Sequence, residues 1–97
     1  MAVLVIAENA GGTVEIDDAV VKSLNLIDDP PSGARIRMAG PMDGGWRVVS
    51  LWESREAFQS FVDQRLKPAL EGAGRPQPQF TFWDIETTWQ PGSGIAP

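Results

Sequence analysis

The 97-residue chain contains no cysteine, no histidine and no tyrosine. Without cysteine it can form no disulfide framework, no iron–sulfur cluster, no thiolate-bound zinc and no cysteine nucleophile. Without histidine it can form no Ser-His-Asp triad and no imidazole-bound metal or haem, and it has no histidine base. The side chains that remain predict neither a metal site nor a cofactor.

The chain also lacks a basic segment. It carries 8 Lys and Arg residues against 13 Asp and Glu residues, a formal net charge of −5, and its basic residues form no run. We therefore expect neither nucleic acid nor an anionic membrane as a partner. The first apolar stretch is short and no basic residues precede it, which predicts neither a signal peptide nor a membrane span and favours a cytoplasmic location.

Periodic hydrophobic patterns predict six elements in the order strand, helix, strand, strand, helix, strand. They are a strand at 2–8, a helix from the N-cap Thr13 to the Asp-Pro step at 29–30, strands at 34–40 and 46–53, a helix from the N-cap Ser54 to Gly72 or Gly74, and a strand at 79–88. Pro68 is expected to kink the last turn of the second helix. The order predicts an α+β fold, a ferredoxin-like βαββαβ sandwich with a four-stranded antiparallel sheet and both helices on one face. We expect one domain at 1–89 and a flexible C-terminal tail at 90–97.

Both faces of the predicted sheet carry apolar residues. The set expected under the helices is Val3, Val5 and Ala7, Ile36 and Met38, Val49 and Leu51, and Trp83 and Ile85. The second set mixes aromatic and charged residues: Leu4, Ile6 and Glu8, Arg35, Arg37 and Ala39, Trp46, Val48, Ser50 and Trp52, and Phe80, Phe82, Asp84 and Glu86. A free face with so many aromatic residues predicts a homodimer through the sheet face. The alternative is an open sheet whose charged residues are simply solvated.

Four segments carry a family resemblance: Gly-Pro at 40–41, Gly-Trp-Arg-Val-Val at 45–49, Trp-Glu-Ser-Arg-Glu-Ala-Phe at 52–58 and Arg-Leu-Lys-Pro-Ala-Leu at 65–70. With them, residues 2–88 resemble the dimeric α+β barrel superfamily, in particular its antibiotic biosynthesis monooxygenase-like small proteins. The resemblance implies a homodimer with an enclosed cavity, used in some relatives for cofactor-free oxygenation of aromatic polyketide-type substrates. Other relatives cyclise or isomerise small molecules or degrade haem.

The resemblance transfers few functional residues. Trp52 matches a tryptophan of the quinone-forming oxygenases, but Val48 stands where their catalytic asparagine lies, four positions earlier. Relatives more often carry histidine near Arg37 and Glu86, and this chain has none. The standard family mechanisms are therefore not expected.

The predicted function is that of a small-molecule-binding dimeric barrel protein and cofactor-independent enzyme, monooxygenase-like or cyclase/isomerase-like. Its substrate is expected to be an apolar aromatic or polyketide-type metabolite in a lumen between the sheet and helices of the dimer. A carboxylate base would deprotonate the substrate so that it can pass an electron to O2. The candidate catalytic residues are Glu86, Arg37 and Asp84, and the candidate substrate contacts are Trp52, Ser50, Val48, Phe82, Arg35, Glu8 and Ile6.

Two alternatives remain open. Arg37 could form a purely structural ion pair with Glu8 or Glu86. The whole protein could be a non-catalytic dimeric ligand-binding or scaffold protein.

Overall fold

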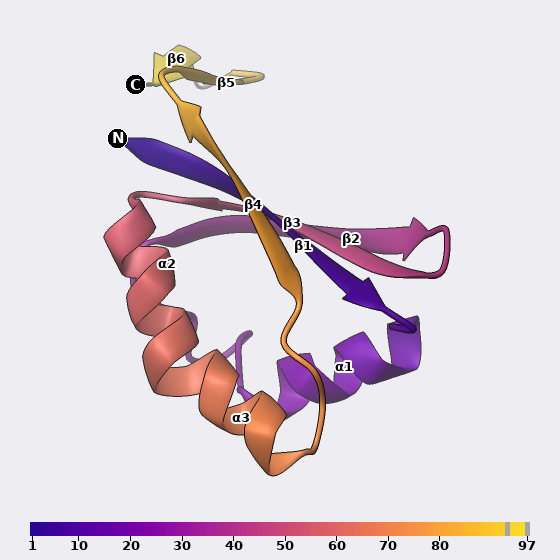
Figure 1. Ribbon diagram of the computed structural model, residues 1–97. Coiled ribbons are helices and arrows are strands. Elements are labelled where there is room, and N and C mark those ends of the chain that lie inside the picture. The colour runs from indigo at the N-terminus through magenta and orange to yellow at the C-terminus, as the bar shows by residue number, and fades with distance from the viewer. Residues whose placement is uncertain (93, 97) are drawn as a thin grey trace.

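Four antiparallel strands and two helical segments follow one another in the predicted order in the computed structural model, which describes residues 1–92 and 94–96. The elements are β1 (Ala2–Ala10), α1 (Val14–Ser23), β2 (Ala34–Met42), β3 (Gly45–Trp52), α2 (Arg55–Phe61), a π-helical turn η1 (Val62–Leu66), α3 (Lys67–Gly72) and β4 (Gln79–Ile85). The sheet order is β2-β3-β1-β4, and the helices all lie on one face of it (Figure 1). The α+β, ferredoxin-like prediction is confirmed.

Both predicted N-caps are present. The Thr13 hydroxyl accepts a hydrogen bond from the Ile16 amide at 3.2 Å, and the Ser54 hydroxyl accepts one from the Ala57 amide at 3.1 Å. Each cap satisfies one of the amides that a helix leaves unpaired at its start. The β3–α2 junction therefore needs only two residues between the last strand position, Trp52, and the first helical one, Arg55.

The first helix ends earlier than predicted. It stops at Ser23, and Asn25 adopts a positive φ of 53°, a conformation that asparagine tolerates better than most residues. Ile27, expected on the apolar stripe, lies outside the helix and is 83% exposed. The asparagine, and not the prolines that follow, thus terminates α1.

The second helical segment accommodates Pro68 through the π-helical turn η1 that precedes it. The Lys67 amide donates to the Val62 carbonyl, five residues back, so the helix widens just before the proline. Pro68 then lies near the start of α3, where its missing amide costs little. The irregularity expected at Pro68 therefore lies one turn earlier, in η1. The helical segment then continues to Gly72.

The assignment of the faces was wrong for three of the four strands. Val3, Val5 and Ala7 do face the helices, but their partners across β1 are Trp52, Ser50 and Val48 on β3 and Asp84, Phe82 and Phe80 on β4. On β2, Arg37 pairs with Ser50 and Ala39 with Val48, so they share this face. The mixed aromatic and charged set therefore lies under the helices, except for its β1 members Leu4, Ile6 and Glu8.

The core lies where the helix-facing side meets α2 and η1. Its buried members are Val3, Val5, Trp52, Phe58 and Val62. The Phe58 ring stacks edge-on against Trp52, with centroids 5.3 Å apart, and meets Phe80 at 5.1 Å. This cluster fixes α2 against the end of β3. No residue of α1 is fully buried, so α1 packs less closely on the sheet.

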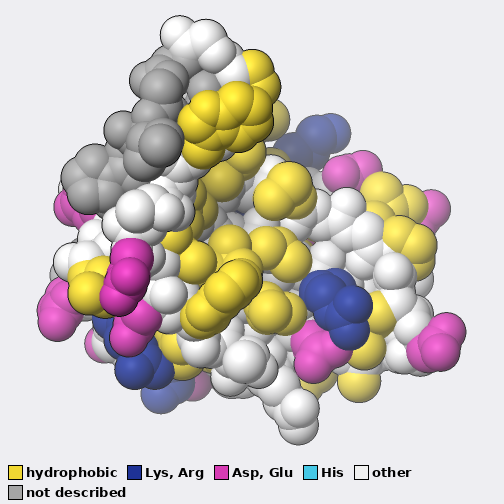
Figure 2. All heavy atoms as spheres, turned by 90° about the horizontal axis from the view of Figure 1, so that it is seen from above, with side chains coloured by type: hydrophobic (Ala, Val, Ile, Leu, Met, Phe, Trp, Pro, Cys, Tyr) yellow, Lys and Arg dark blue, Asp and Glu magenta, His cyan; other side chains and the backbone are white. Residues whose placement is uncertain are grey.

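The helix-free face of the sheet is strongly apolar. Figure 2 looks down on this face and shows hydrophobic side chains gathered at its centre, with charged groups towards the edge. Ile36, Met38 and Trp83, expected under the helices, lie here and are 49%, 54% and 65% exposed. Glu8 pairs with Arg47 at 2.8 Å on the same face.

The C-terminal segment continues beyond β4. The last strand, predicted at 79–88, ends at Ile85. A small antiparallel hairpin follows, in which β5 (Thr88–Gln90) begins before the predicted tail at 90–97 and pairs with β6 (Gly94–Ala96) within it. Figure 1 shows it apart from the main sheet, on the side away from the helices. Residues 93 and 97 lie outside the described residues, and the flexibility of the tail stays a prediction.

Candidate functional site

A single chain encloses a cavity of about 470 Å3 between the helix-facing side of the sheet and the helices. In Figure 1, α2 and α3 descend from one end of the sheet and α1 lies below its other end. The cavity is partly open and mostly apolar. The lumen therefore lies between sheet and helices, and not on the free face of the sheet.

The sheet supplies a wall with bulky ends and a hollow middle. Trp46, Val48, Ser50 and Trp52 project from β3 towards the helices because they occupy alternate positions of one strand. Two large indoles thus flank two smaller side chains, and the neighbouring β1 residue, Ala7, is smaller still. The missing volume at these central positions is what leaves the space open.

The helices supply the opposite wall. Ile16, Val20 and Leu24 line the cavity from α1 and its C-cap, at the helical spacing that the sequence predicts. Phe58 and Phe61 line it from α2. Aromatic and branched aliphatic side chains thus surround most of the space, which suits an apolar ligand.

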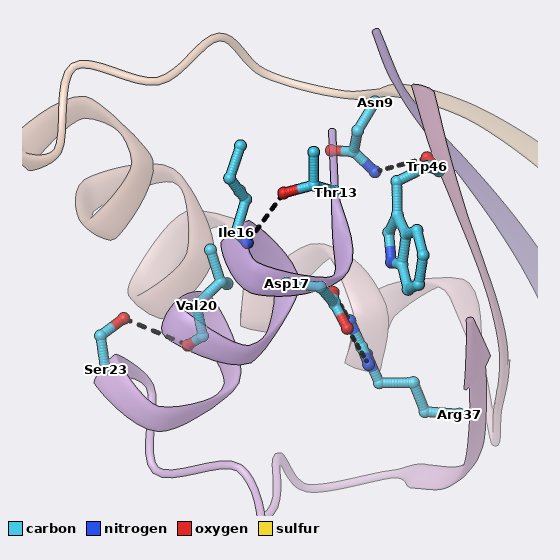
Figure 3. A network of polar contacts seen from close by, with 8 residues as sticks. All are labelled: Asn9, Thr13, Ile16, Asp17, Val20, Ser23, Arg37 and Trp46. Carbon is cyan, nitrogen blue, oxygen red and sulfur yellow. Dashed lines mark hydrogen bonds and ion pairs between the residues drawn. The ribbon is translucent and has the colours of Figure 1, made fainter. Parts of the chain in front are cut away.

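An ion pair crosses the cavity wall from β2 to α1. Both terminal nitrogens of Arg37 donate to the two carboxylate oxygens of Asp17, one of them, Nη1, at 3.2 Å (Figure 3). The side chains are 35% and 12% exposed, respectively. The predicted partners of Arg37, Glu8 and Glu86, are wrong. Asp17 was missed, although it lies three and seven residues before Val20 and Leu24 and so on the apolar stripe of the helix.

The two cavity tryptophans differ in their hydrogen bonding. The Trp52 indole nitrogen donates to the Ser50 hydroxyl at 2.8 Å, which leaves the hydroxyl hydrogen free to donate in turn. The Trp46 indole nitrogen is buried and has no hydrogen-bond partner in the described part of the chain. An unpaired buried donor costs about 1–3 kcal/mol. In Figure 3 the Trp46 ring extends towards α1, and its nitrogen lies on the side of the ring that faces this helix.

Two glycines allow Trp46 to take this position. A Cβ on Gly45 would lie 2.2 Å from the Asn9 carbonyl oxygen, and one on Gly12 would lie 2.8 Å from the Trp46 Cβ. Asn9 also donates its side-chain amide to the Trp46 carbonyl at 3.3 Å. The backbone at Gly12 and Gly45 can thus pack closely against Asn9 and Trp46 because glycine has no side chain.

The structure brings together half of the predicted site residues. The five that line the cavity are Arg35, Arg37, Val48, Ser50 and Trp52. Phe82 faces the helices but belongs to the core, under the guanidinium of Arg55 at 4.1 Å.

The other four lie outside the cavity lining. Ile6 and Glu8 lie on the opposite face of the sheet. Asp84 faces the helix side but is exposed, and Glu86 is exposed beyond the end of β4. Among the described lining residues, Asp17 is the only carboxylate.

Within residues 1–92 and 94–96, no group of three or more His, Cys, Asp or Glu residues could hold a metal ion. No described helix has the length and apolar character needed to cross a membrane.

Solved structures share this fold. The chain superposes on Rv0793 from Mycobacterium tuberculosis with a TM-score of 0.63 at 16% identity, covering 89% of this chain and 96% of that one. It superposes on a variant of SnoaB, a cofactor-independent oxygenase from Streptomyces nogalater, with a TM-score of 0.59 at 13% identity, covering 90% and 94%. A Deinococcus radiodurans protein assigned to the antibiotic biosynthesis monooxygenases gives a TM-score of 0.56 at 12% identity, covering 93% and 97%.

The chain has the fold of the antibiotic biosynthesis monooxygenase-like proteins. This confirms the fold that the resemblance predicts. No protein-family model matches the sequence, and no curated protein matches it. At these identities the shared fold carries no activity with it.

Proposed function

We propose that the chain binds an apolar aromatic or polyketide-type metabolite in the cavity between its sheet and helices. The cavity of about 470 Å3 carries this proposal. Its size is in the usual range for small-molecule sites, about 300–1,000 Å3, and five aromatic residues line it: Trp46, Trp52, Phe58, Phe61 and Phe80. Aromatic side chains from several elements around the space favour an aromatic ligand.

We further propose cofactor-independent catalysis, monooxygenase-like or cyclase/isomerase-like. SnoaB, which shares the fold, is described as a cofactor-independent oxygenase. In such a reaction the substrate itself supplies the electrons, and the protein must provide a base and a dry pocket. Arg37 and Asp17 are at the cavity wall, whereas Asp84 and Glu86, the proposed bases, would act only on a substrate that extends past Trp52 towards β4.

The alternative, a non-catalytic ligand-binding protein, has one observation in its favour. Asp17, the only carboxylate among the described lining residues, is engaged by both terminal nitrogens of Arg37. Its two oxygens are thus already occupied by a partner within the protein. Binding without turnover is therefore the second candidate function.

We also propose a homodimer through the helix-free face of the sheet. Ile36, Met38 and Trp83 are exposed there together, which is unusual for a monomer. Glu8 and Arg47 neutralise each other on the same face, so a second copy would meet little net charge. A cytoplasmic location stays a prediction of the sequence.

Neighbouring valines on opposite faces of β3 test the cavity. Val48→Phe fills its middle, whereas Val49→Phe adds the same bulk on the helix-free face. We expect a hydroxyanthrone to quench tryptophan fluorescence in the wild type and in Val49→Phe, and to bind Val48→Phe at least about tenfold more weakly. Equal binding by Val48→Phe, with its fold intact by circular dichroism, would place the ligand elsewhere.

An oxygen electrode separates the two candidate functions. An oxygenase would convert the methylene of the hydroxyanthrone to a ketone, consuming O2 and releasing water faster than the spontaneous reaction. A cyclase or isomerase would change the substrate without consuming O2, which mass spectrometry of a substrate panel would detect. If the protein only binds the ligand, its tryptophan fluorescence would be quenched, with no O2 consumed and no change in the substrate.

A further inference from the structure

The cavity is positively charged inside an acidic protein. Of the chain's 8 basic residues, three line the cavity (Arg35, Arg37 and Arg75), whereas only Asp17 of its 13 acidic residues is found in the described lining. The lining therefore has a formal charge of +2, three positive less one negative, in a chain of net charge −5. Charges of one sign in a cleft with apolar walls concentrate the opposite charge there.

Arg37 has the geometry to hold a carboxylate. A guanidinium binds a carboxylate through two parallel hydrogen bonds, and its pairing with Asp17 already has this form. These bonds use two of its five N–H donors, and its side chain is still 35% exposed. A ligand carboxylate could thus take the place of Asp17, or share the guanidinium with it.

Two groups of the cavity wall have a hydrogen atom for which no acceptor is found in the described part of the chain. The Trp46 indole nitrogen has no partner in the described part of the chain, and the Ser50 hydroxyl accepts from Trp52 with its own hydrogen to spare. The Trp46 nitrogen is closed off from solvent, so a ligand must displace neighbouring side chains to reach it. A ligand that supplies acceptor oxygens suits this wall better than one that supplies donors.

We propose that the ligand is an apolar acid whose carboxylate binds Arg37 in exchange for Asp17, with its apolar body between the sheet and the helices. This specifies the chemistry of the ligand and rests on the proposed function. Since the same ion pair ties β2 to α1, the exchange also frees the first half of α1 from the sheet.

A matched pair of probes tests the charge. 2-Naphthoic acid and 2-naphthamide have the same ring system and nearly the same shape, but only the acid is charged at pH 7. In calorimetric titrations we expect the acid to bind about tenfold or more tightly than the amide. Equal binding of both would overturn the carboxylate proposal and leave the proposed function standing. Binding of neither probe would count against both.

Variants then locate the charge. Arg37→Gln should abolish the preference for the acid over the amide, whereas Arg47→Gln, the same change in the ion pair on the opposite face, should retain it. Asp17→Asn removes the internal competitor and should tighten binding of the acid alone. A preference for the acid that survives in a folded Arg37→Gln variant would overturn the proposal. If Arg37→Gln does not fold, the Asp17→Asn variant is decisive, and unchanged or weaker binding of the acid to it would overturn the proposal.

Discussion

Trp83 offers a direct test of the proposed dimer. Its side chain is 65% exposed on the helix-free face, where it projects from the edge strand β4. A tryptophan can bury about 200 Å2, so covering the exposed share removes about 130 Å2 from water. At about 25 cal/mol per Å2 this stabilises the dimer by about 3 kcal/mol from each protomer.

Trp83→Ala should therefore weaken the dimer by about 6 kcal/mol, since a two-fold interface contains the residue twice. At about 1.4 kcal/mol for each tenfold change, Kd would rise by about four powers of ten when the indole is fully covered. We expect sedimentation velocity to show a wild-type dimer at micromolar concentration and a monomeric variant.

Ile27 provides the control for this experiment. It is 83% exposed, but it lies in the turns that follow α1, on the helix side of the sheet. We expect Ile27→Ala to stay dimeric. A monomeric wild type would refute the reasoning, and equal weakening by the two variants would show that the sheet face is not the contact.

Two further predictions concern the scaffold. Phe58→Ala should lower the free energy of unfolding by about 3–5 kcal/mol, because it empties the centre of the aromatic core. Ile27→Ala, at an 83% exposed position, should change the free energy of unfolding by less than about 0.5 kcal/mol. Similar urea midpoints for the two variants would contradict this packing. Gly45→Ala should cost about 1–3 kcal/mol because its Cβ would lie 2.2 Å from the Asn9 carbonyl oxygen, whereas Gly40→Ala meets nothing within 4 Å and should be nearly neutral in the same assay.

The elements could be predicted from the sequence because each has a local cause. Thr13 and Ser54 are good N-caps, and alternation along β3 is clear. The end of α1 was missed because a single asparagine with positive φ stops the helix before the more conspicuous prolines.

The side of the sheet that meets the helices could not be predicted because both faces carry apolar residues, most evenly along β1 and β3. Alternation then tells which residues share a face of one strand, but not which face meets the helices. The mixed sets of β2, β3 and β4 were correctly grouped with one another, and only the phase of β1 relative to them was reversed. That phase is set by pairings such as Val5 with Ser50 and Phe82, which are distant in sequence.

Only half of the predicted site residues line the cavity, because the site too depends on contacts between residues that are distant in sequence. Val48 and Ser50, which share β3 with Trp52, were found, whereas Asp17 on α1 and Trp46 at the other end of β3 gain their roles only when α1 packs across the sheet. Ile6 and Glu8 were assigned to the site because they were grouped with the wrong face.

The size of the cavity itself argues for a function. A dry, closed void of about 470 Å3 would cost about 11 kcal/mol at about 24 cal/mol per Å3. The whole stability of a domain of this size is about 5–15 kcal/mol, so such a void could not persist empty and dry. The space must therefore hold water or a ligand, which its partial opening permits. Water is a poor match for walls made of indole and phenyl rings, so an apolar ligand that displaces it gains free energy at almost every contact.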